Sequence, residues 1–331
     1  MVHSACGSNL AETEKFARQW GWASGSDDWK SLISDPEVDL VDVCTPNHLH
    51  AEMSVAALEA GTHVACEKPM AGTLDDARLM RDAAKKAARK GVQSFVWFNY
   101  RRVPAIAYAH QLVRSGRLGR IFHVRASYLQ DWGHPDTPLV WRFQSKKAGS
   151  GAHGDLNAHI IDMARFLTGD EVSEVVGSVQ ETFVKQRELV EQAGSAIKGT
   201  GSGGRGRKRT GKSTVDDALL FLARFKGGAI GSFEATRVAT GNLNRNTIEI
   251  TTWIFWGALH RPALRAESSG LATTLPPRSL RFGAARKCRG RAAGPCAWRP
   301  KRRTPCMTCR SATTARACAC CCTTRACPRP T

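Results

Sequence analysis

The sequence contains no long hydrophobic run. None of its apolar stretches approaches the ~20 residues that an α-helix needs to cross a bilayer. Its N-terminus has neither the basic nor the apolar segment of a signal peptide. A membrane-spanning protein and a secreted protein are therefore both excluded from our expectations, and we predict a soluble protein of the cytoplasm.

Cysteine and acidic residues are also scarce, each in a different part of the chain. Residues 1–252 hold three of the 12 cysteines, which is typical of a reduced intracellular protein rather than a disulfide scaffold. Residues 253–331 hold 16 Lys and Arg against one acid, a balance of +15 out of the net charge of +19. The body of the protein is thus nearly neutral, and the C-terminal segment distorts the average composition.

Residues 253–331 lack both strand and helix periodicity, which argues against a packed core. We predict a disordered, aberrant tail, and our hypothesis is that it is the out-of-frame translation of a GC-rich coding sequence. Its cysteine pairs, such as Cys306 and Cys309, are similar to the thiolate pairs of structural zinc sites, but no histidine follows His260. We therefore expect no metal site, and no specific nucleic-acid target for the basic tail.

Residues 1–103 contain an alternation of short apolar runs and helical patterns, which is typical of βαβ units in a parallel sheet. We predict strands over residues 38–45, 63–66 and 92–99, and helices over residues 10–20, 50–60 and 74–90. Glycines such as Gly61 and Gly91 mark helix ends. The pattern predicts an α/β fold class with an incomplete doubly wound, Rossmann-like sheet, as in a partial dinucleotide-binding domain.

From residue 104 onwards the pattern changes to longer β-type runs. A linking helix is expected over residues 104–115, followed by strands over residues 121–129, 172–183, 218–225 and 229–235. The last two are separated by Lys226, Gly227 and Gly228, which predicts an antiparallel hairpin. We predict an α+β domain over residues 104–252. Its largely antiparallel sheet would be interrupted by a flexible, basic loop over residues 196–213.

Three literal phosphate-binding motifs occur in the wrong context. Two copies of G-x-G-x-x-G begin at Gly149 and Gly201, and a P-loop pattern ends at Lys212 and Ser213. A phosphate-binding glycine turn must follow a buried strand and open a helix, so that helix amides meet the phosphate. A polar segment precedes Gly149, and the other two motifs lie in the basic loop, so chance matches are favoured.

Segment 149–162 is the most informative one, because a glycine-rich turn leads into a predicted helix with Asp155, His159 and Asp162 along one face. Asp155 is expected to hold the tautomer of His159 and to stabilise its protonated form, as a general base near neutral pH requires. Lys68 ends a predicted parallel strand, where open α/β sheets build their sites. Taken singly, such residues are more often surface or core residues; together they predict an active site.

These features resemble the glucose-fructose oxidoreductase / inositol dehydrogenase (Gfo/Idh/MocA) family of nicotinamide-dependent sugar and polyol dehydrogenases. The resemblance extends from residue 2 to residue 250. The segments that carry it are residues 44–48, 67–70, 98–102, 128–132, 149–162 and 214–217. It implies a dinucleotide-binding domain followed by an α+β domain for substrate binding and oligomerisation.

The resemblance also implies a role for individual residues. Lys68, Asp155 and His159 would be catalytic and would contact the substrate. His159 would take the hydroxyl proton as hydride leaves the same carbon, Lys68 would polarise the oxygen, and Asp155 would orient His159. Trp132 and Arg142 are candidates for the substrate side. The cofactor, NAD or NADP, would be bound by Cys6, Ser8, Asn9, Thr45, Pro46, Asn47, His48, Glu67, Lys68, Pro69 and Asn99.

The chain departs from the family pattern at three points. Family members begin with a strand, the pyrophosphate glycines and a helix, whereas this sequence begins at what resembles the second strand, so ~30 residues are absent. Cys6 and Ser8 follow that strand in place of the Asp that often holds the ribose, which leaves NAD and NADP both open. Asn157 replaces a frequent glycine before His159. We expect weakened cofactor binding, and an inactive enzyme is one of the alternatives.

The first functional hypothesis is a dehydrogenase that acts on a secondary hydroxyl of a sugar or an inositol-like cyclitol, within a homo-oligomer like that of intact family members. The second is a non-catalytic sugar-binding protein without a cofactor; the retention of Lys68 beside an Asp-His pair speaks against it. The third is a basic nucleic-acid-binding protein that uses residues 201–212 and the tail. Binding of a nicotinamide cofactor, of sugar alone, or of nucleic acid distinguishes the three.

Overall fold

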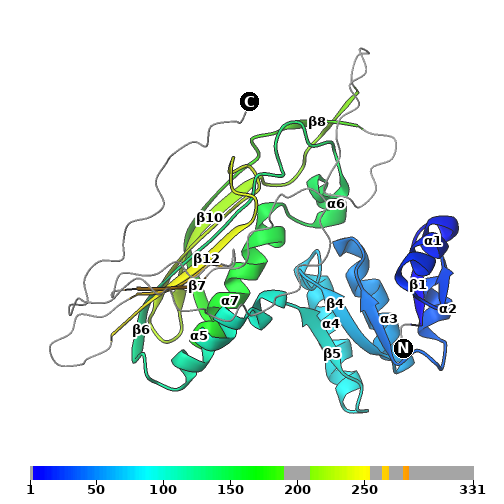
Figure 1. Cartoon of the computed structure of the whole chain (residues 1–331), viewed down its shortest axis with the longest axis horizontal. Helices are drawn as coiled ribbons and strands as arrows, with labels where there is room; N and C mark the ends of the chain where they lie inside the picture. Colours follow the sequence, from blue (N-terminus) through cyan, green and yellow to red (C-terminus); the bar gives the residue numbers. More distant parts are fainter. Residues whose placement is uncertain (1–2, 190–208, 254–262, 268–278, 283–331) are drawn as a thin grey trace, which may run out of the picture. The chain divides into compact units, whose positions relative to one another are not determined.

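The computed structural model describes residues 3–189, 209–253, 263–267 and 279–282, which Figure 1 draws in colour. By internal contacts the described residues belong to one compact unit. The second glycine motif at Gly201 and the cysteine pair at Cys306 and Cys309 lie outside the described residues. Over the described ranges, no helix combines the length and apolar character needed to cross a bilayer.

The first region, residues 3–103, forms two separate parallel sheets with helices beside them. Strands β1 (Ser4–Cys6) and β2 (Ser24–Ser26) form one sheet, and β3 (Leu40–Val43), β4 (His63–Glu67) and β5 (Ser94–Trp97) form the other, in that order. The helices are α1 (Leu10–Trp20), α2 (Trp29–Ile33), α3 (His50–Ala60) and α4 (Leu74–Ala88), with 3-10 turns η1 (Asn47–Leu49) and η2 (Asn99–Arg102). The prediction of an incomplete doubly wound domain is confirmed.

Capping residues account for the helix bounds. The side chains of Asn9 and Thr73 accept hydrogen bonds from backbone amides in the first turns of α1 and α4. Helices α1 and α3 end at Gly21 and Gly61, which adopt the left-handed conformation that favours glycine. The helices predicted over residues 10–20 and 50–60 are confirmed with these bounds.

Strands β1 and β3 each leave one edge without a ladder partner among the described strands. Large apolar side chains of this region are exposed, including Phe16 and Trp20 of α1 and Leu40 of β3. In the doubly wound strand order a strand lies between the two that correspond to β1 and β3. The gap therefore falls where the strand that we expect to be absent would lie.

The second region, from residue 104, is built on one seven-stranded mixed sheet in the order β14-β13-β12-β6-β11-β10-β7. Its strands are β6 (Arg120–Leu129), β7 (Val172–Glu181), β10 (Ala218–Phe225), β11 (Ile230–Thr236), β12 (Arg245–Trp253), β13 (Ala263–Glu267) and β14 (Ser279–Phe282). The antiparallel hairpin β10–β11 is confirmed, while β6–β11 and β13–β14 pair in parallel. The helical elements are α5 (Pro104–Arg114), η3 (Trp141–Phe143), α6 (Ser145–Ala148), η4 (His153–Asn157) and α7 (Ala158–Thr168).

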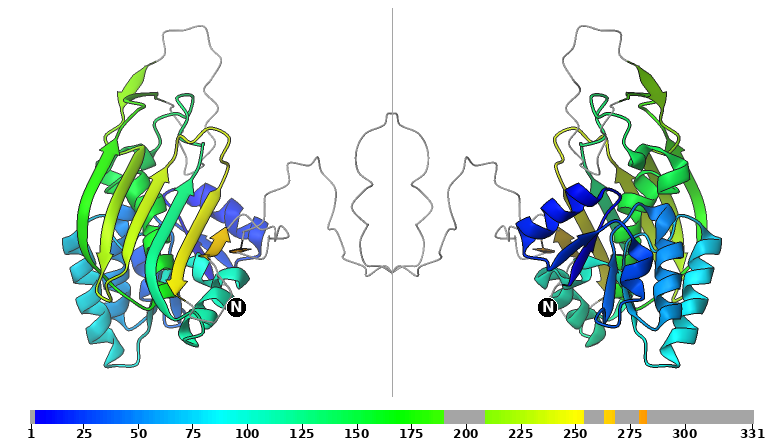
Figure 2. Two further views of the ribbon diagram at one scale, coloured as in Figure 1. Left: turned by 90° about the vertical axis from the view of Figure 1, so that its left-hand side faces the viewer. Right: turned by 90° about the vertical axis from the view of Figure 1, so that its right-hand side faces the viewer.

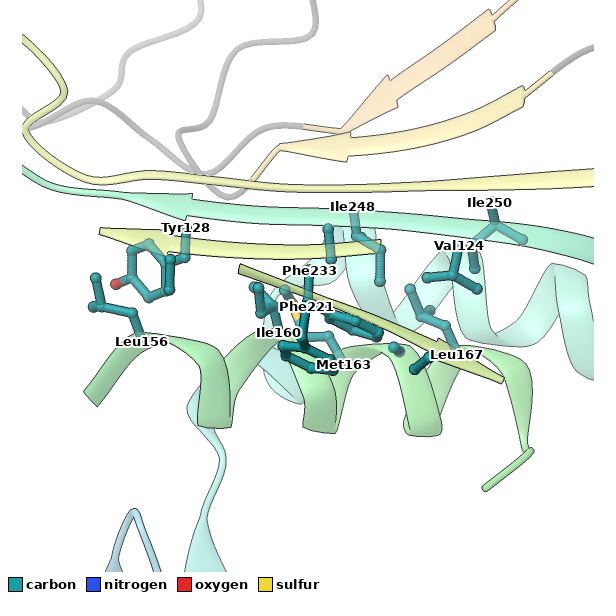
Figure 3. Close-up of a cluster of buried hydrophobic side chains, with 14 of the residues drawn as sticks. Val124, Tyr128, Leu156, Ile160, Met163, Leu167, Phe221, Phe233, Ile248 and Ile250 are labelled. Carbon is teal, nitrogen blue, oxygen red and sulfur yellow. The ribbon is translucent and has the colours of Figure 1, made fainter. Parts of the chain in front are cut away.

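The core of this region lies between the sheet and α7. Figure 3 shows Ile160, Met163 and Leu167 of α7 pointing at Phe221 and Phe233 of the hairpin, and all five side chains are buried. Along β10 the pattern alternates, so that every second side chain enters this core. The side chains between them point to the opposite face of the sheet, which Figure 2 shows at left.

Three expectations differ from the structure. Strand β9 (Thr210–Lys212) lies inside the predicted flexible loop and pairs antiparallel with β8 (Gln186–Glu188). Strands β13 and β14 lie inside the predicted disordered tail. The predicted helix after Gly149 does not run as one α-helix, because residues His153–Asn157 form a π-helix and α7 begins only at Ala158. In each case a partner distant in sequence decides the local structure, and local composition does not record that partner.

Candidate active site

Lys68 and Asp155 form an ion pair between the two regions. Lys68 follows β4, and its Nζ donates hydrogen bonds to Asp155 Oδ1 at 3.0 Å and to the Asp155 carbonyl oxygen at 2.8 Å. Both side chains are mostly buried, with 15% and 23% of their surface exposed. The Lys68 ammonium therefore binds both the side chain and the backbone of Asp155 in the π-helix. Short π-helical segments are frequent at functional sites.

The carboxylate of Asp155 is ionised over the whole physiological range. Burial alone would raise its pKa, but the positive charges of Lys68, Arg237 and Arg142 outweigh burial and lower the pKa to about 2. The site therefore combines one buried carboxylate with several cations, which suits a reaction that develops negative charge on a substrate oxygen.

His159 is the third member of the site and lies in the first turn of α7, 7% exposed. Aromatic rings surround it: Tyr100 and Phe98 meet it edge to face at centroid distances of 4.8 and 6.3 Å, and Tyr128 lies at 5.8 Å. Its Nδ1 is buried and has no hydrogen-bond partner among the described residues. A buried polar atom without a partner is unusual in a folded protein, and a polar group of a bound molecule would satisfy it.

The protonation of His159 differs from our expectation. Burial lowers its pKa to about 3, with a further contribution from the Lys68 ammonium, and Asp155 opposes this only in part. The imidazole is therefore neutral at pH 7 rather than stabilised in its protonated form. The hydrogen bonds of the Asp155 side chain go to Lys68, so in this arrangement Asp155 orients the lysine and not the histidine tautomer.

The four residues predicted beside the cofactor after β3 lie together at the carboxyl end of that strand. Asn47 Nδ2 donates to the Ala148 carbonyl at 2.8 Å, which ties this turn to the second region. Thr45 Oγ1 is buried and has no hydrogen-bond partner among the residues that the structure describes. An unsatisfied hydroxyl at the strand end fits a polar group of a dinucleotide. The turn consists of Thr45, Pro46, Asn47 and His48.

The remaining candidates fall into two groups. Glu67, Pro69 and Asn99 lie beside the site: Glu67 Oε2 accepts from the Lys68 N–H at 2.9 Å, the Pro69 carbonyl contacts His50 Nδ1 at 2.9 Å, and Asn99 opens η2. Cys6 is the last residue of β1, and Ser8 and Asn9 follow this strand, which belongs to a different sheet from β4, the strand before Lys68. In the structure the Asn9 side chain caps α1.

The candidates for the substrate side are both fixed through aromatic contacts. Trp132 Nε1 donates to Gln130 Oε1 at 2.6 Å, and the Arg237 guanidinium lies 5.2 Å from the Trp132 ring centroid. Arg142 stacks on Trp141 at 4.3 Å. Arg142 is also close enough to Asp155 to lower the pKa of that carboxyl.

Sequence reasoning missed the aromatic residues that enclose His159. Two of the chain's three tyrosines meet here, and their hydroxyls are 2.6 Å apart. Because Tyr128 donates to Asn244 Oδ1 at 2.7 Å, Tyr100 is the donor between the two tyrosines. Both tyrosines lie inside segments that carry the family resemblance. Because the chain has only three tyrosines, the presence of two of them in these segments was the signal that could have identified them.

Arg101 and Asp162 were also missed as a pair. The Arg101 guanidinium binds both carboxylate oxygens of Asp162, which is 4% exposed on α7. Arg101 belongs to η2 of the first region, so this fork-like contact is a second link between the regions. Asp162 therefore shares a helix with His159 but serves docking rather than proton transfer.

The lysine, the carboxylate and the neutral histidine lie between a parallel, Rossmann-like sheet and the second region, an arrangement typical of nicotinamide-dependent oxidoreductases. Family models agree: "Oxidoreductase family, NAD-binding Rossmann fold" matches residues 2–95, and "GFO/IDH/MocA C-terminal domain" matches residues 106–252. The chain belongs to the Gfo/Idh/MocA family of oxidoreductases.

Individual relatives are similar over most of the described chain. Levoglucosan dehydrogenase of Pseudarthrobacter phenanthrenivorans is 47% identical over 71% of this chain and 58% of its own length. Myo-inositol 2-dehydrogenase of Thermotoga maritima is 30% identical over 63% of this chain and 52% of its own length. The chain thus spans little more than half the length of these relatives.

Solved structures give the same result. An oxidoreductase domain protein from Kribbella flavida is 48% identical with a TM-score of 0.69, covering 76% of this chain and 62% of that one. Levoglucosan dehydrogenase in complex with NADH and levoglucosan is 42% identical with a TM-score of 0.67 at the same coverage. At this sequence identity the similarity supports both the fold and the family.

Proposed function

We propose that this chain carries the active site of a dehydrogenase that transfers a hydride between NAD or NADP and a secondary hydroxyl of a sugar or an inositol-like cyclitol. The observation that carries the proposal is the contact of Lys68 with Asp155 beside the buried, neutral imidazole of His159. The printed names of the relatives, which include levoglucosan and myo-inositol dehydrogenases, support the substrate class.

In the proposed reaction His159 accepts the hydroxyl proton, because its imidazole is neutral at pH 7 and therefore able to take up a proton. Lys68 donates to the same oxygen and stabilises the negative charge that develops on it. Asp155 holds the ammonium of Lys68 in place. A bound nicotinamide ring would accept the hydride from the carbon that carries this hydroxyl.

The cofactor would lie over the carboxyl ends of β3 and β4. Thr45, Asn47 and Glu67 are among the residues at these strand ends with polar side chains, and the unsatisfied Thr45 hydroxyl supports a contact there. Trp132 and Arg142 would line the substrate side. The proposed enzyme belongs in the cytoplasm, which the free cysteines Cys6, Cys44 and Cys66 of the described residues support.

Self-association is proposed through the open face of the large sheet. Val179, Leu220, Leu222 and Ile230 are exposed on β7, β10 and β11, although they lie within a regular sheet. Contiguous exposed apolar surface of this kind marks protein interfaces. A second copy of the chain, packed face to face, would bury these side chains and form a homo-oligomer.

The two other hypotheses receive no support from the comparisons, since the named relatives are dehydrogenases. A sugar-binding protein without a cofactor would not need the Lys68 ammonium next to a neutral histidine. The basic segment proposed for nucleic-acid binding lies mostly outside the described residues.

The proposal is tested by titrating NADH and NADPH into the chain and following nicotinamide fluorescence, with levoglucosan and myo-inositol as trial substrates. A matched protein carries a strand, glycine turn and helix of a relative ahead of residue 3, to fill the gap between β1 and β3. We expect the extended protein to bind cofactor in the micromolar range and to reduce NAD or NADP with one of the sugars. Absence of cofactor binding in both proteins would overturn the proposal.

A further inference from the structure

Asp216, in the segment that leads into β10, accepts hydrogen bonds from three consecutive backbone amides of the glycine turn. The Gly151 N–H donates to Asp216 Oδ1 at 2.7 Å, the Ala152 N–H to the Asp216 carbonyl at 3.0 Å, and the His153 N–H to Asp216 Oδ2 at 2.9 Å. Asp216 is 8% exposed. This single side chain and its carbonyl therefore determine where the π-helix starts.

The chemistry of a helix start explains the arrangement. The first amides of a helix have no partner within the helix, and a carboxylate satisfies them while matching the positive end of the helix dipole. The approach of the two segments is close: a Cβ at Gly151 would lie 1.8 Å from the Asp216 carbonyl oxygen. Only glycine allows the turn to lie against Asp216 in this way.

Buried charge supports Asp216 from the other side. Arg237, which is 1% exposed, donates from Nη2 to the Asp216 carbonyl at 2.9 Å and from Nη1 to the Arg142 carbonyl at 3.1 Å. The same guanidinium helps to lower the pKa of Asp155. Asp216 and Arg237 thus hold both the glycine turn and the backbone at Arg142 in place.

The turn leads directly to the reacting groups. The Asp155 N–H donates to the Gly151 carbonyl at 3.0 Å, so a shift of Gly151 is passed on to Asp155 within one hydrogen bond. Lys68 reaches Asp155 from the other region by hydrogen bonds of 2.8 and 3.0 Å. Bonds of this length tolerate little displacement.

We infer that Asp216 is a positioning residue that sets the place of Asp155 against Lys68 by holding the three amides at the start of the π-helix. That the contact between Lys68 and Asp155 belongs to an active site rests on the proposed function. Asp216 itself touches neither substrate nor cofactor in this scheme, and it acts through the turn.

The direction of the change in the pKa of Asp155 distinguishes a positioning role of Asp216 from a purely electrostatic one. Replacing Asp216 by Asn removes a negative charge near Asp155, and by Coulomb's law alone this lowers the pKa of Asp155 or leaves it unchanged. Loss of the His153 bond, in contrast, releases the turn and moves Asp155 away from Lys68, which raises the pKa. The sign of the change therefore decides between the two.

The matched control is Asp217→Asn. Asp217 is the next residue, is fully buried and binds Arg187 and the Val184 N–H at 3.2 and 2.8 Å, without a contact to the three amides. Its substitution removes the same charge and disturbs the fold at least as much. Urea unfolding of both variants establishes that each one is folded.

The experiment follows the side-chain carboxyl carbon of Asp155 by NMR between about pH 3.5 and 6, where a carboxyl with a low pKa gives a flat curve. We expect a titration in Asp216→Asn and a flat curve in the parent chain and in Asp217→Asn. A flat curve in Asp216→Asn, or a titration in both variants, would overturn the inference. The measurement needs no turnover, so failure of both the chain and the extended protein to bind cofactor would contradict the proposed function and leave this test intact.

Kinetics of the extended protein give a second readout. We expect Asp216→Asn to lower kcat by about 100-fold, as small misplacements of reacting groups do, with little change in the KM for the cofactor, which binds on the other region. An equal rise in both KM values with unchanged kcat would point to a general loss of structure and would refute the positioning role.

Discussion

The two regions of this protein differ in the continuity of their sheets and in the size of their buried apolar clusters. In the second region one continuous sheet covers a cluster of 20 buried residues. In the first, two short sheets stand apart and the buried cluster has eight residues. Burial of apolar surface is the main source of stability, so continuity of the sheet, rather than the number of helices, decides how much of a region is core.

The active site draws on both regions, and this makes the difference relevant to function. Asp155 and His159 stand on the well-packed side, whereas Lys68 and Thr45 stand at strand ends of the divided side. Two ion pairs, Lys68 with Asp155 and Arg101 with Asp162, join the sides. The geometry of the site is therefore set by the better-packed region and completed by the weaker one.

Truncation of the core should give the largest effect and the sharpest contrast. Phe233→Ala removes a ring that is 2% exposed and stacked on Phe221 at 4.6 Å, and we expect a loss of about 3–5 kcal/mol in the free energy of unfolding. Met80→Ala, in the smaller cluster, should lie near the lower limit of about 2 kcal/mol. Urea unfolding measures both, and Leu222→Ala on the open face is the control. A larger loss for Met80→Ala than for Phe233→Ala would break the comparison.

Removal of the ammonium that joins the regions should affect the site more than the fold. We expect Lys68→Met to lower kcat/KM of the extended protein by about 100- to 1000-fold, because a donor to the developing oxyanion is lost. The pKa of His159 should rise from about 3 and stay below its ordinary value, because burial, the larger cause, remains. NMR titration of the imidazole measures this, with the exposed Lys85→Met as control. An unchanged pKa would show that Lys68 does not reach the histidine.

The stability of the second region should depend on pH through His159. Its pKa is about 3 in the folded state against 6.5 as the ordinary value, so its contribution is complete above the unfolded pKa and is lost as pH falls from there towards 3. The loss reaches at most about 1.4 kcal/mol per pH unit. We expect His159→Gln to flatten the dependence of unfolding on pH between about 6.5 and 4. His123→Gln, where burial lowers the pKa of a less buried ring, should keep most of the slope.

The smallest effect on stability should come from the open sheet face. Leu222→Lys should change the free energy of unfolding by about 0.5 kcal/mol or less, because the side chain is exposed. The same substitution should convert a homo-oligomer into a smaller species in light scattering after gel filtration. Trp20→Lys, on an exposed site of the first region, should not change the assembly. Equal behaviour of both variants would remove the distinction between the two exposed surfaces.

Local signals predicted most of the elements correctly. The helices over residues 10–20 and 50–60 have their observed bounds because Asn9, Gly21 and Gly61 act within one or two turns. The hairpin was predictable because Gly227 and Gly228 separate two alternating runs. In these cases the determining contacts are near in sequence.

The features that escaped prediction depend on contacts between distant residues. The π-helix at Asp155 is held by Asp216 and Lys68, which lie 61 and 87 positions away in the chain. The neutrality of His159 follows from burial among aromatic rings, those of Tyr100 and Tyr128, that lie far from it in the chain. The candidate catalytic residues could be named from the sequence, but their partners could not: the sequence paired Asp155 with His159, whereas the Asp155 side chain binds Lys68.

The long sequence separation of Lys68 and Asp155 also has a consequence for the order of folding. Closing a chain loop of 87 residues costs about 4 kcal/mol of entropy at room temperature, whereas the β10–β11 hairpin closes a turn of a few residues. The hairpin and the helix against it are therefore expected to form early, and the ion pair only after both regions have collapsed. A nascent or partly unfolded chain would lose its reactive centre first, while much of its secondary structure persisted.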